Sequence, residues 1–136
     1  MKLLRVGTQG QEKIASLDSK NIIRELSDQI NDLTPDIFSS EYLEKIKKID
    51  LSKQKEINPK TRIGPFINNP KNYFCVGKNF INHIKELNSS TPKNPMIFSK
   101  ANCISGPNDD IIIPKDSNKV DWECEIGVCL KEDTYQ

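Results

Sequence analysis

The most regular stretch of the sequence is VDWECEIGV, which runs from Val120 to Val128. Apolar and polar residues alternate throughout it, and a period of two is typical of a β-strand with one apolar face. Asp121, Glu123 and Glu125 share the opposite face of that strand. The stretch therefore predicts a half-buried strand whose solvent-facing side carries three carboxylates.

Two of these carboxylates could bind a metal ion together. Successive residues on one face of a strand lie about 7 Å apart. Glu123 and Glu125 could therefore bend toward one hard cation at about 2.1 Å from each oxygen. Gly127 follows on the same face and leaves room beside the backbone. The alternative is that these carboxylates only form the exposed face of an antiparallel strand, and the spacing alone favours that simpler interpretation.

Length and charge exclude several classes of function. The chain has 136 residues, enough for one modest domain or for a small lobe with part of a larger one. Its 20 Lys and Arg residues nearly balance its 19 Asp and Glu residues, so no overall field attracts nucleic acid or an anionic membrane. We find no export signal and no apolar run of membrane-spanning length. We therefore expect a cytoplasmic protein without nucleic-acid or membrane partners, whose function depends on a local site.

Shorter patterns predict the remaining elements. Before Pro70 we expect strands at 2–6, 15–17 and 22–26, and a helix at 41–49 that begins at Ser39 or Ser40. The polar, proline-containing residues 50–69 predict a connecting segment. After Pro70 we expect strands at 73–76, 96–98 and 111–113, a helix at 79–87 and a turn at 105–109.

The sole histidine lies in the second predicted helix. His83 and Glu86 are three residues apart there and share one face. A carboxylate beside an imidazole orients it and raises its basicity, as a general base requires. An ordinary surface pair is the alternative, which the residues alone favour. Lys100 could supply a cation for an anionic substrate, although most lysines are only solvated.

Five segments, in order along the chain, resemble the fumarylacetoacetate hydrolase family. The first two are RVGTQGQEKIASLD and RELSDQINDL, at 5–18 and 24–33. The others are CVGKNFINHIKE, PMIFSKANCISGPNDDIIIP and DWECEIGV, at 75–86, 95–114 and 121–128. The N-terminal segments are most similar to the subgroup called ureidoglycolate lyase or 2,4-dioxo-acid hydrolase.

The resemblance implies an α+β fold that is mostly β. A small N-terminal antiparallel unit at 1–65 would be followed, at 70–136, by the first and incomplete part of the family's catalytic mixed β-roll. Enzymes of the family typically act as homodimers, so the resemblance also implies a second copy as a partner.

The resemblance also implies the site residues and the chemistry. Glu123 and Glu125 match the family's ExE metal ligands. His83 and Glu86 match its HxxE pair, and Lys100 matches the lysine after the FxK strand. The implied cofactor is Mg²⁺ or Mn²⁺, which oxygen ligands suit. The implied function is a hydrolase or lyase that cleaves a C–C bond of a small 2-oxo or 2,4-dioxo acid through a metal-stabilised enolate, while His83 activates water.

One departure from the family pattern bears on activity. The family's third metal ligand is an aspartate well downstream of the ExE pair, and the sequence ends at Gln136 without it. We therefore expect a truncated chain, a fragment or half of a split gene, that is inactive alone and that a complementing C-terminal polypeptide could complete. A noncatalytic remnant is the main alternative, and a complete small binding domain unrelated to any metal is the least favoured one.

Overall fold

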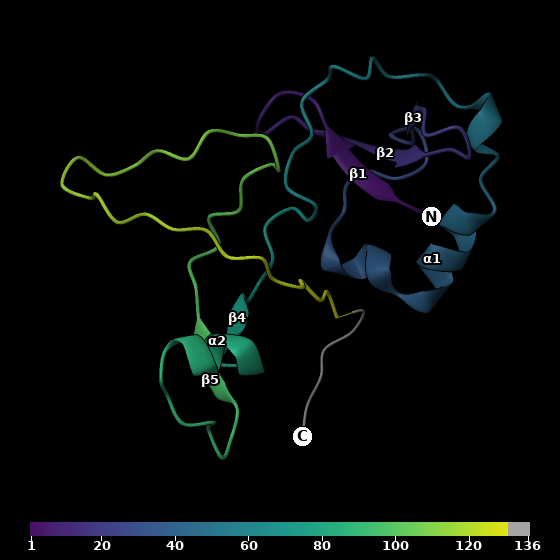
Figure 1. Cartoon of the computed structure of the whole chain (residues 1–136). Helices are drawn as coiled ribbons and strands as arrows, with labels where there is room; N and C mark the ends of the chain where they lie inside the picture. Colours follow the sequence, from purple (N-terminus) through teal and green to yellow (C-terminus); the bar gives the residue numbers. More distant parts are fainter. Residues whose placement is uncertain (131–136) are drawn as a thin grey trace. The chain divides into compact units, whose positions relative to one another are not determined.

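The computed structural model of the protein describes residues 1–130, which form an α+β fold with short antiparallel strands and few helices (Figure 1). The chain divides into two compact units. Unit 1 comprises residues 1–68 together with the chain from Ile104 onward, and unit 2 comprises residues 69–103. The domain assignment to 1–65 and 70–136 stays a prediction. Every helix in the described part of the chain is too short or too polar to span a lipid bilayer.

Unit 1 contains a three-stranded antiparallel sheet. Its strands are β1 (Leu3–Val6), β2 (Lys13–Leu17) and β3 (Ile23–Glu25), in the order β1-β2-β3. Asp18 forms the turn between β2 and β3, because its carboxylate accepts hydrogen bonds from the backbone N–H groups of Lys20 and Ile22. The three strands expected in this region are therefore confirmed.

One face of this sheet packs on helices. Ile14 of β2 is fully buried against apolar residues that follow β3. These residues lie before and within the short 3₁₀ helix η1 (Pro35–Phe38) and the helix α1 (Ser40–Lys47), and they are Leu26, Ile30, Leu33, Ile37 and Ile46. Figure 1 shows α1 beside the three strands. The helix expected at 41–49 is confirmed, although the Ser39 side chain makes no capping hydrogen bond.

The other face is covered by the segment that was expected only to connect two units. Val6, Ala15 and Ile23 are buried on this face, and Ile57 and Ile63 pack against them. The same segment contains the 3₁₀ helix η2 (Leu51–Lys53), pairs with β1 at Val6 and Ile63, and pairs with β3 at Arg24 and Glu56. Both faces of the sheet are therefore covered, because the isoleucines of this polar stretch pack on the second face, and each edge strand pairs with the stretch at one position.

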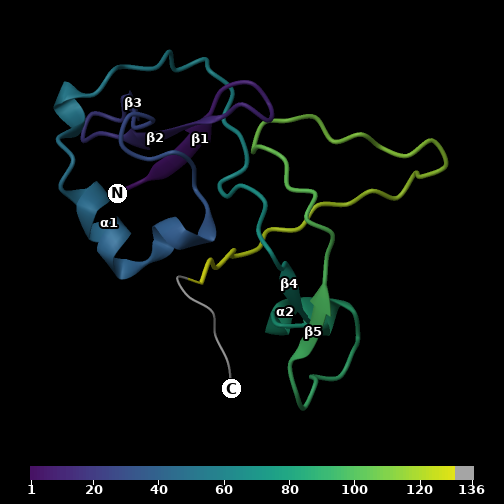
Figure 2. The ribbon, with the colours of Figure 1, turned by 180° about the vertical axis from the view of Figure 1, so that it is seen from behind.

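Unit 2 contains a two-stranded ribbon and a short helix. β4 (Phe74–Gly77) pairs antiparallel with β5 (Met96–Ser99), and α2 (Ile81–Glu86) lies between them in sequence. The helix is in front of the ribbon in Figure 1 and behind it in Figure 2, so it covers one face. Ile84 is the helix residue that is buried. The two strands and the helix expected here are confirmed, and the helix is shorter than the expected range of 79–87.

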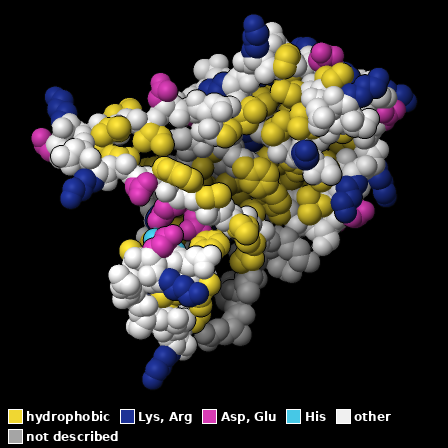
Figure 3. Space-filling model, viewed as in Figure 1, with side chains coloured by type: hydrophobic (Ala, Val, Ile, Leu, Met, Phe, Trp, Pro, Cys, Tyr) yellow, Lys and Arg dark blue, Asp and Glu magenta, His cyan; other side chains and the backbone are white. Residues whose placement is uncertain are grey.

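The strands expected at 111–113 and 120–128 are wrong. Residues 110–130 contain no strand, and their apolar side chains are exposed, with Ile112 at 90%, Trp122 at 82% and Ile126 at 84%. Alternation sorts side chains onto two faces, but a strand also needs a hydrogen-bonded neighbour along its length. Within residues 1–130 no segment pairs with this stretch. Figure 3 shows apolar side chains on the surface of the protein.

We predict that Leu33→Ala will lower the free energy of unfolding by about 3 kcal/mol, because Leu33 is fully buried in the larger apolar cluster. Urea unfolding followed by circular dichroism measures the change. Ile112→Ala, at a 90% exposed position, is the control and should change the same quantity by less than about 0.5 kcal/mol. Equal losses in both variants would mean that this cluster is not the core of unit 1.

Candidate functional site

The two candidate metal ligands lie on the extended chain of residues 110–130. Glu123 and Glu125 are both exposed, and a Cβ atom at Gly127 would meet nothing within 4 Å. In residues 1–130 no three His, Cys, Asp or Glu side chains gather closely enough to hold a metal ion. The carboxylates are the right chemical type for Mg²⁺ or Mn²⁺, but within this part of the chain they form a pair, which is a partial ligand set.

The candidate base and its partner lie on α2 in unit 2. His83 Nδ1 lies 3.6 Å from Glu86 Oε2, with side chains that are 54% and 77% exposed. The separation is that of an ion pair when the imidazole is protonated, and one turn of helix sets it. Lys100 directly follows β5, and its backbone N–H donates to the Tyr73 carbonyl at 3.0 Å. Unit 2 therefore carries all three candidate catalytic residues.

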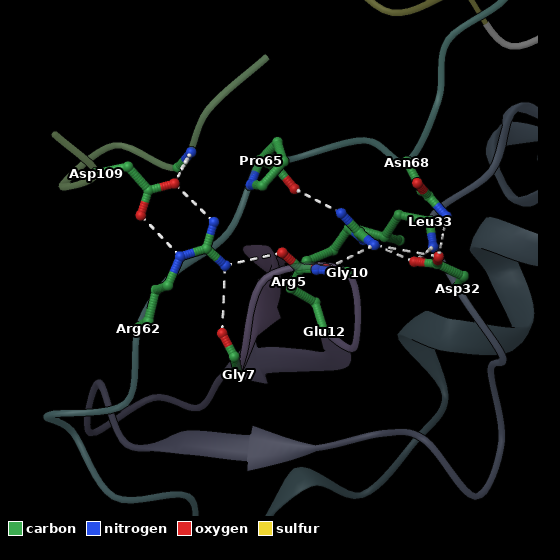
Figure 4. Close-up of polar contacts among 11 residues, drawn as sticks. Arg5, Gly7, Gly10, Glu12, Asp32, Leu33, Arg62, Pro65, Asn68 and Asp109 are labelled. Carbon is green, nitrogen blue, oxygen red and sulfur yellow. Dashed lines mark hydrogen bonds and ion pairs between the residues drawn. The ribbon is translucent and has the colours of Figure 1, made fainter. Parts of the chain in front are cut away.

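A set of linked ion pairs lies in unit 1, and none of the candidate site residues belongs to it. Five charged residues of alternating sign follow one another in space, and we call them the charge chain (Figure 4). They are Asp32, Arg5, Glu12, Arg62 and Asp109.

Glu12 is the centre of the charge chain. The side chains of Arg5 and Glu12 are 5% and 3% exposed, so neither charge is stable there without a partner. One Glu12 oxygen accepts from Arg5 at 3.3 Å, and the other accepts from Arg62 at 2.8 Å. Arg5 also donates to Asp32 at 2.7 Å. Gly64 leaves room for Glu12, because a Cβ there would lie 2.7 Å from the Glu12 Cγ.

Arg62 connects this centre to the turn at residues 106–109. It donates two hydrogen bonds to Asp109, from Nε at 2.7 Å and from Nη2 at 2.6 Å, in the forked geometry that arginine forms with carboxylates. Asp109 also accepts from the backbone N–H of Gly106 at 2.7 Å, which closes the turn. The turn that the sequence predicts at 105–109 is therefore confirmed, and it is bound to the N-terminal sheet.

Charge and hydrogen bonding shift the ionisation of this cluster. Burial raises the pKa of Glu12, but hydrogen bonds from Arg62 and its own backbone, with the charges of Arg5 and Arg62, bring it below the usual value. Hydrogen bonds from Arg62, and then from the backbone of Gly106, lower the pKa of Asp109. The pKa of Arg62 is raised by the same two carboxylates. Glu12, Asp109 and Arg62 therefore stay charged near neutral pH.

The charge chain was not predicted, although all of its residues except Arg62 lie in segments that carry the family resemblance. Arg5 sits between Leu4 and Val6 in a strand, and a charge between apolar residues is a signal for a buried ion pair. Its partners could not be identified from the sequence, because Asp32 is 27 residues away and Arg62 meets Asp109 across 47.

Comparison with known proteins points to the same family. Residues 72–136 match the family model described as "Fumarylacetoacetate (FAA) hydrolase C-terminal". Residues 72–136 are therefore similar to the C-terminal part of the fumarylacetoacetate hydrolase family, in agreement with the resemblance seen in the sequence. All five candidate residues (His83, Glu86, Lys100, Glu123 and Glu125) fall within the matched range.

The chain is also similar to bacterial proteins that carry the name "Putative hydrolase". Proteins of Burkholderia orbicola and Burkholderia lata are each 40% identical to it over 131 residues, and one of Burkholderia multivorans is 39% identical over the same length. Each match covers 96% of this chain and 46% of the relative. The chain therefore spans less than half the length of these relatives.

We predict that Glu12→Gln will lower the free energy of unfolding by about 2–3 kcal/mol at pH 7, because a neutral amide leaves two guanidinium groups without their shared anion. The folded pKa of Glu12 lies below its unfolded value of about 4.3. Its contribution is therefore complete above about pH 5 and is lost as the pH falls through the folded pKa. Urea unfolding should therefore show a smaller difference in unfolding free energy between wild type and Glu12→Gln near pH 3 than at pH 7.

The matched control is Glu56→Gln. The Glu56 side chain is 60% exposed and lies 3.7 Å from Arg24, so its loss should change the unfolding free energy by less than about 0.5 kcal/mol at either pH. A difference between wild type and Glu12→Gln that is the same at both pH values would show that the carboxylate charge is not what stabilises this region.

Proposed function

We propose that this chain provides part of the active site of a divalent-metal-dependent hydrolase that cleaves a C–C bond of a small 2-oxo or 2,4-dioxo acid in the cytoplasm. The observation that carries the proposal is the family match at residues 72–136, since it contains every candidate residue. The 40% identity to hydrolase-named relatives over 131 residues supports the same class of reaction.

Glu123 and Glu125 are the residues that would hold the cation, as Mg²⁺ or Mn²⁺. Their carboxylates are hard oxygen donors, and both are accessible in the described structure. When bound, a divalent cation supplies positive charge that stabilises negative charge on substrate oxygens. Two carboxylates close in sequence also repel each other in the absence of a cation, which favours cation binding electrostatically.

His83 would take a proton from water, and Glu86 would orient its ring. The imidazole is half exposed, so water reaches it, and Glu86 lies close enough to stabilise the protonated ring. Lys100 would attract the carboxylate of the substrate to the site. For the 2,4-dioxo acid 2,4-dioxopentanoate, the proposed reaction consumes one water molecule and yields pyruvate and acetate. The oxygen of that water forms the new C–O bond at the carbonyl carbon whose C–C bond breaks.

We further propose that a second polypeptide completes the site. The described residues supply two carboxylates and no cluster of three ligands. The family's mixed β-roll needs neighbours for the chain at 110–130, whose apolar residues are exposed. A complementing C-terminal polypeptide and a second copy of the chain are the proposed partners. The partial ligand set also favours one other candidate function, a noncatalytic subunit that associates with such a partner.

We predict that calorimetric titration of this chain alone with Mg²⁺ will give a Kd weaker than about 1 mM, because two monodentate carboxylates make a weak site. Co-expression with the C-terminal half of the Burkholderia orbicola relative should tighten the Kd at least about tenfold. Glu123→Gln should remove that gain, and Asp116→Asn, on the same exposed stretch, should keep it. If the chain alone binds Mg²⁺ tightly and Glu123→Gln does not change the Kd, then Glu123 and Glu125 are not the metal ligands.

We predict that the complemented protein will hydrolyse 2,4-dioxopentanoate in the presence of Mg²⁺, measured as loss of enol absorbance and release of pyruvate. His83→Asn should lower kcat by about 10²–10⁴-fold, as expected for removal of a general base. Lys85→Gln, on the same helix, is the control and should leave kcat within about twofold. A complemented protein that binds Mg²⁺ but turns over no oxo acid would favour the noncatalytic subunit.

A further inference from the structure

We infer that Arg62 is a positioning residue, which holds the turn at residues 106–109 on the N-terminal sheet and thereby fixes the starting point of the chain that carries Glu123 and Glu125. The assignment of those two glutamates as metal ligands rests on the proposed function. The attachment of the turn rests only on contacts within unit 1.

The backbone around Arg62 is itself fixed to β1. The N–H of Gly7 donates to the Arg62 carbonyl at 2.9 Å, and the N–H of Gly64 donates to the Arg5 carbonyl at 2.7 Å. Glu12 and the carbonyl of Gly7 accept from Arg62 Nη1 at 2.8 and 3.2 Å. One edge of the guanidinium is therefore held by the sheet, and the other edge is directed at Asp109.

A steric observation independent of charge supports the same attachment. A Cβ atom at Gly106 would lie 2.1 Å from the carbonyl oxygen of Ile63 and 3.1 Å from the Cα of Gly64. Real side chains do not approach backbone atoms so closely, so the turn can dock here only with glycine at its first position. The turn and the chain at 63–64 are in direct backbone contact, and the ion pair lies beside that contact.

The attachment matters because the following residues have little structure of their own. Residues 110–130 form no strand, and the backbone hydrogen bond from Ser117 to Pro114 is local. The position of such a chain depends strongly on where its first residues are anchored. Arg62 contacts Asp109 at that anchor, so it acts on the candidate ligands through the turn, as a positioning residue.

The test measures, without any metal, the distance between helix α1, which packs on the N-terminal sheet, and the chain between the candidate ligands. Nitroxide labels are placed at Cys124, which lies between the two glutamates, and at Glu44→Cys on the exposed face of α1. Cys75, Cys103 and Cys129 are replaced by Ser in the full chain. Double electron–electron resonance then gives the distribution of distances between the two labels.

Arg62→Gln and Gly106→Ala should each broaden this distribution about twofold or more, because the first removes the fork and the second blocks docking. Arg62→Lys keeps the charge without the fork and should broaden it less. The matched control is Arg24→Gln, which breaks the partly buried pair with Asp18 but leaves the turn untouched, so the parent distribution should persist.

A distribution in Arg62→Gln as narrow as that of the parent would overturn the inference, and so would equal broadening in Arg24→Gln or a parent distribution as broad as in denaturant. Asp109→Asn replaces Arg62→Gln if circular dichroism shows that the latter does not fold. Failure of Mg²⁺ binding would reject the proposed metal ligands and leave this measurement intact, so the two failures are distinguishable.

Discussion

The structure of unit 1 depends on a single buried carboxylate that two arginines share. Glu12 is almost fully removed from water, and each of its oxygens faces a guanidinium from a different part of the chain. Desolvating that charge is costly unless both partners are present. Strand β1, the residues around Arg62 and the residues around Glu12 must therefore come together as one assembly, and Gly64 must be small enough to admit the carboxylate.

The same constraint separates the two kinds of polar residue in this protein. The side chains of the charge chain are largely removed from water and form ion pairs with one another. These residues therefore stabilise the fold. The candidate site residues are exposed, and no group of three possible metal ligands forms among the residues that the structure describes. Accessible polar groups retain the capacity to bind a ligand, whereas groups that already satisfy one another in the interior do not.

Local signals explain why much of the fold could be predicted from the sequence. Asp18 and the residues after it form a turn, and the short apolar runs on either side of that turn do pair as strands. The stretch at 120–128 has a clear alternation, but whether it forms a strand depends on a distant partner that alternation cannot reveal. The candidate site residues came from a family pattern, and the ion pairs of Arg62 were missed because they join residues far apart in sequence.

The edges of the N-terminal sheet are partly occupied, and this affects where the protein can associate with other chains. The pairing of Val6 with Ile63 and of Arg24 with Glu56 occupies hydrogen-bonding groups at both borders of that sheet. Intermolecular strand exchange and fibril growth both begin at an unoccupied border. In the described residues the β4–β5 ribbon pairs with no further strand, so its edges are more open to strand exchange than the borders of the N-terminal sheet.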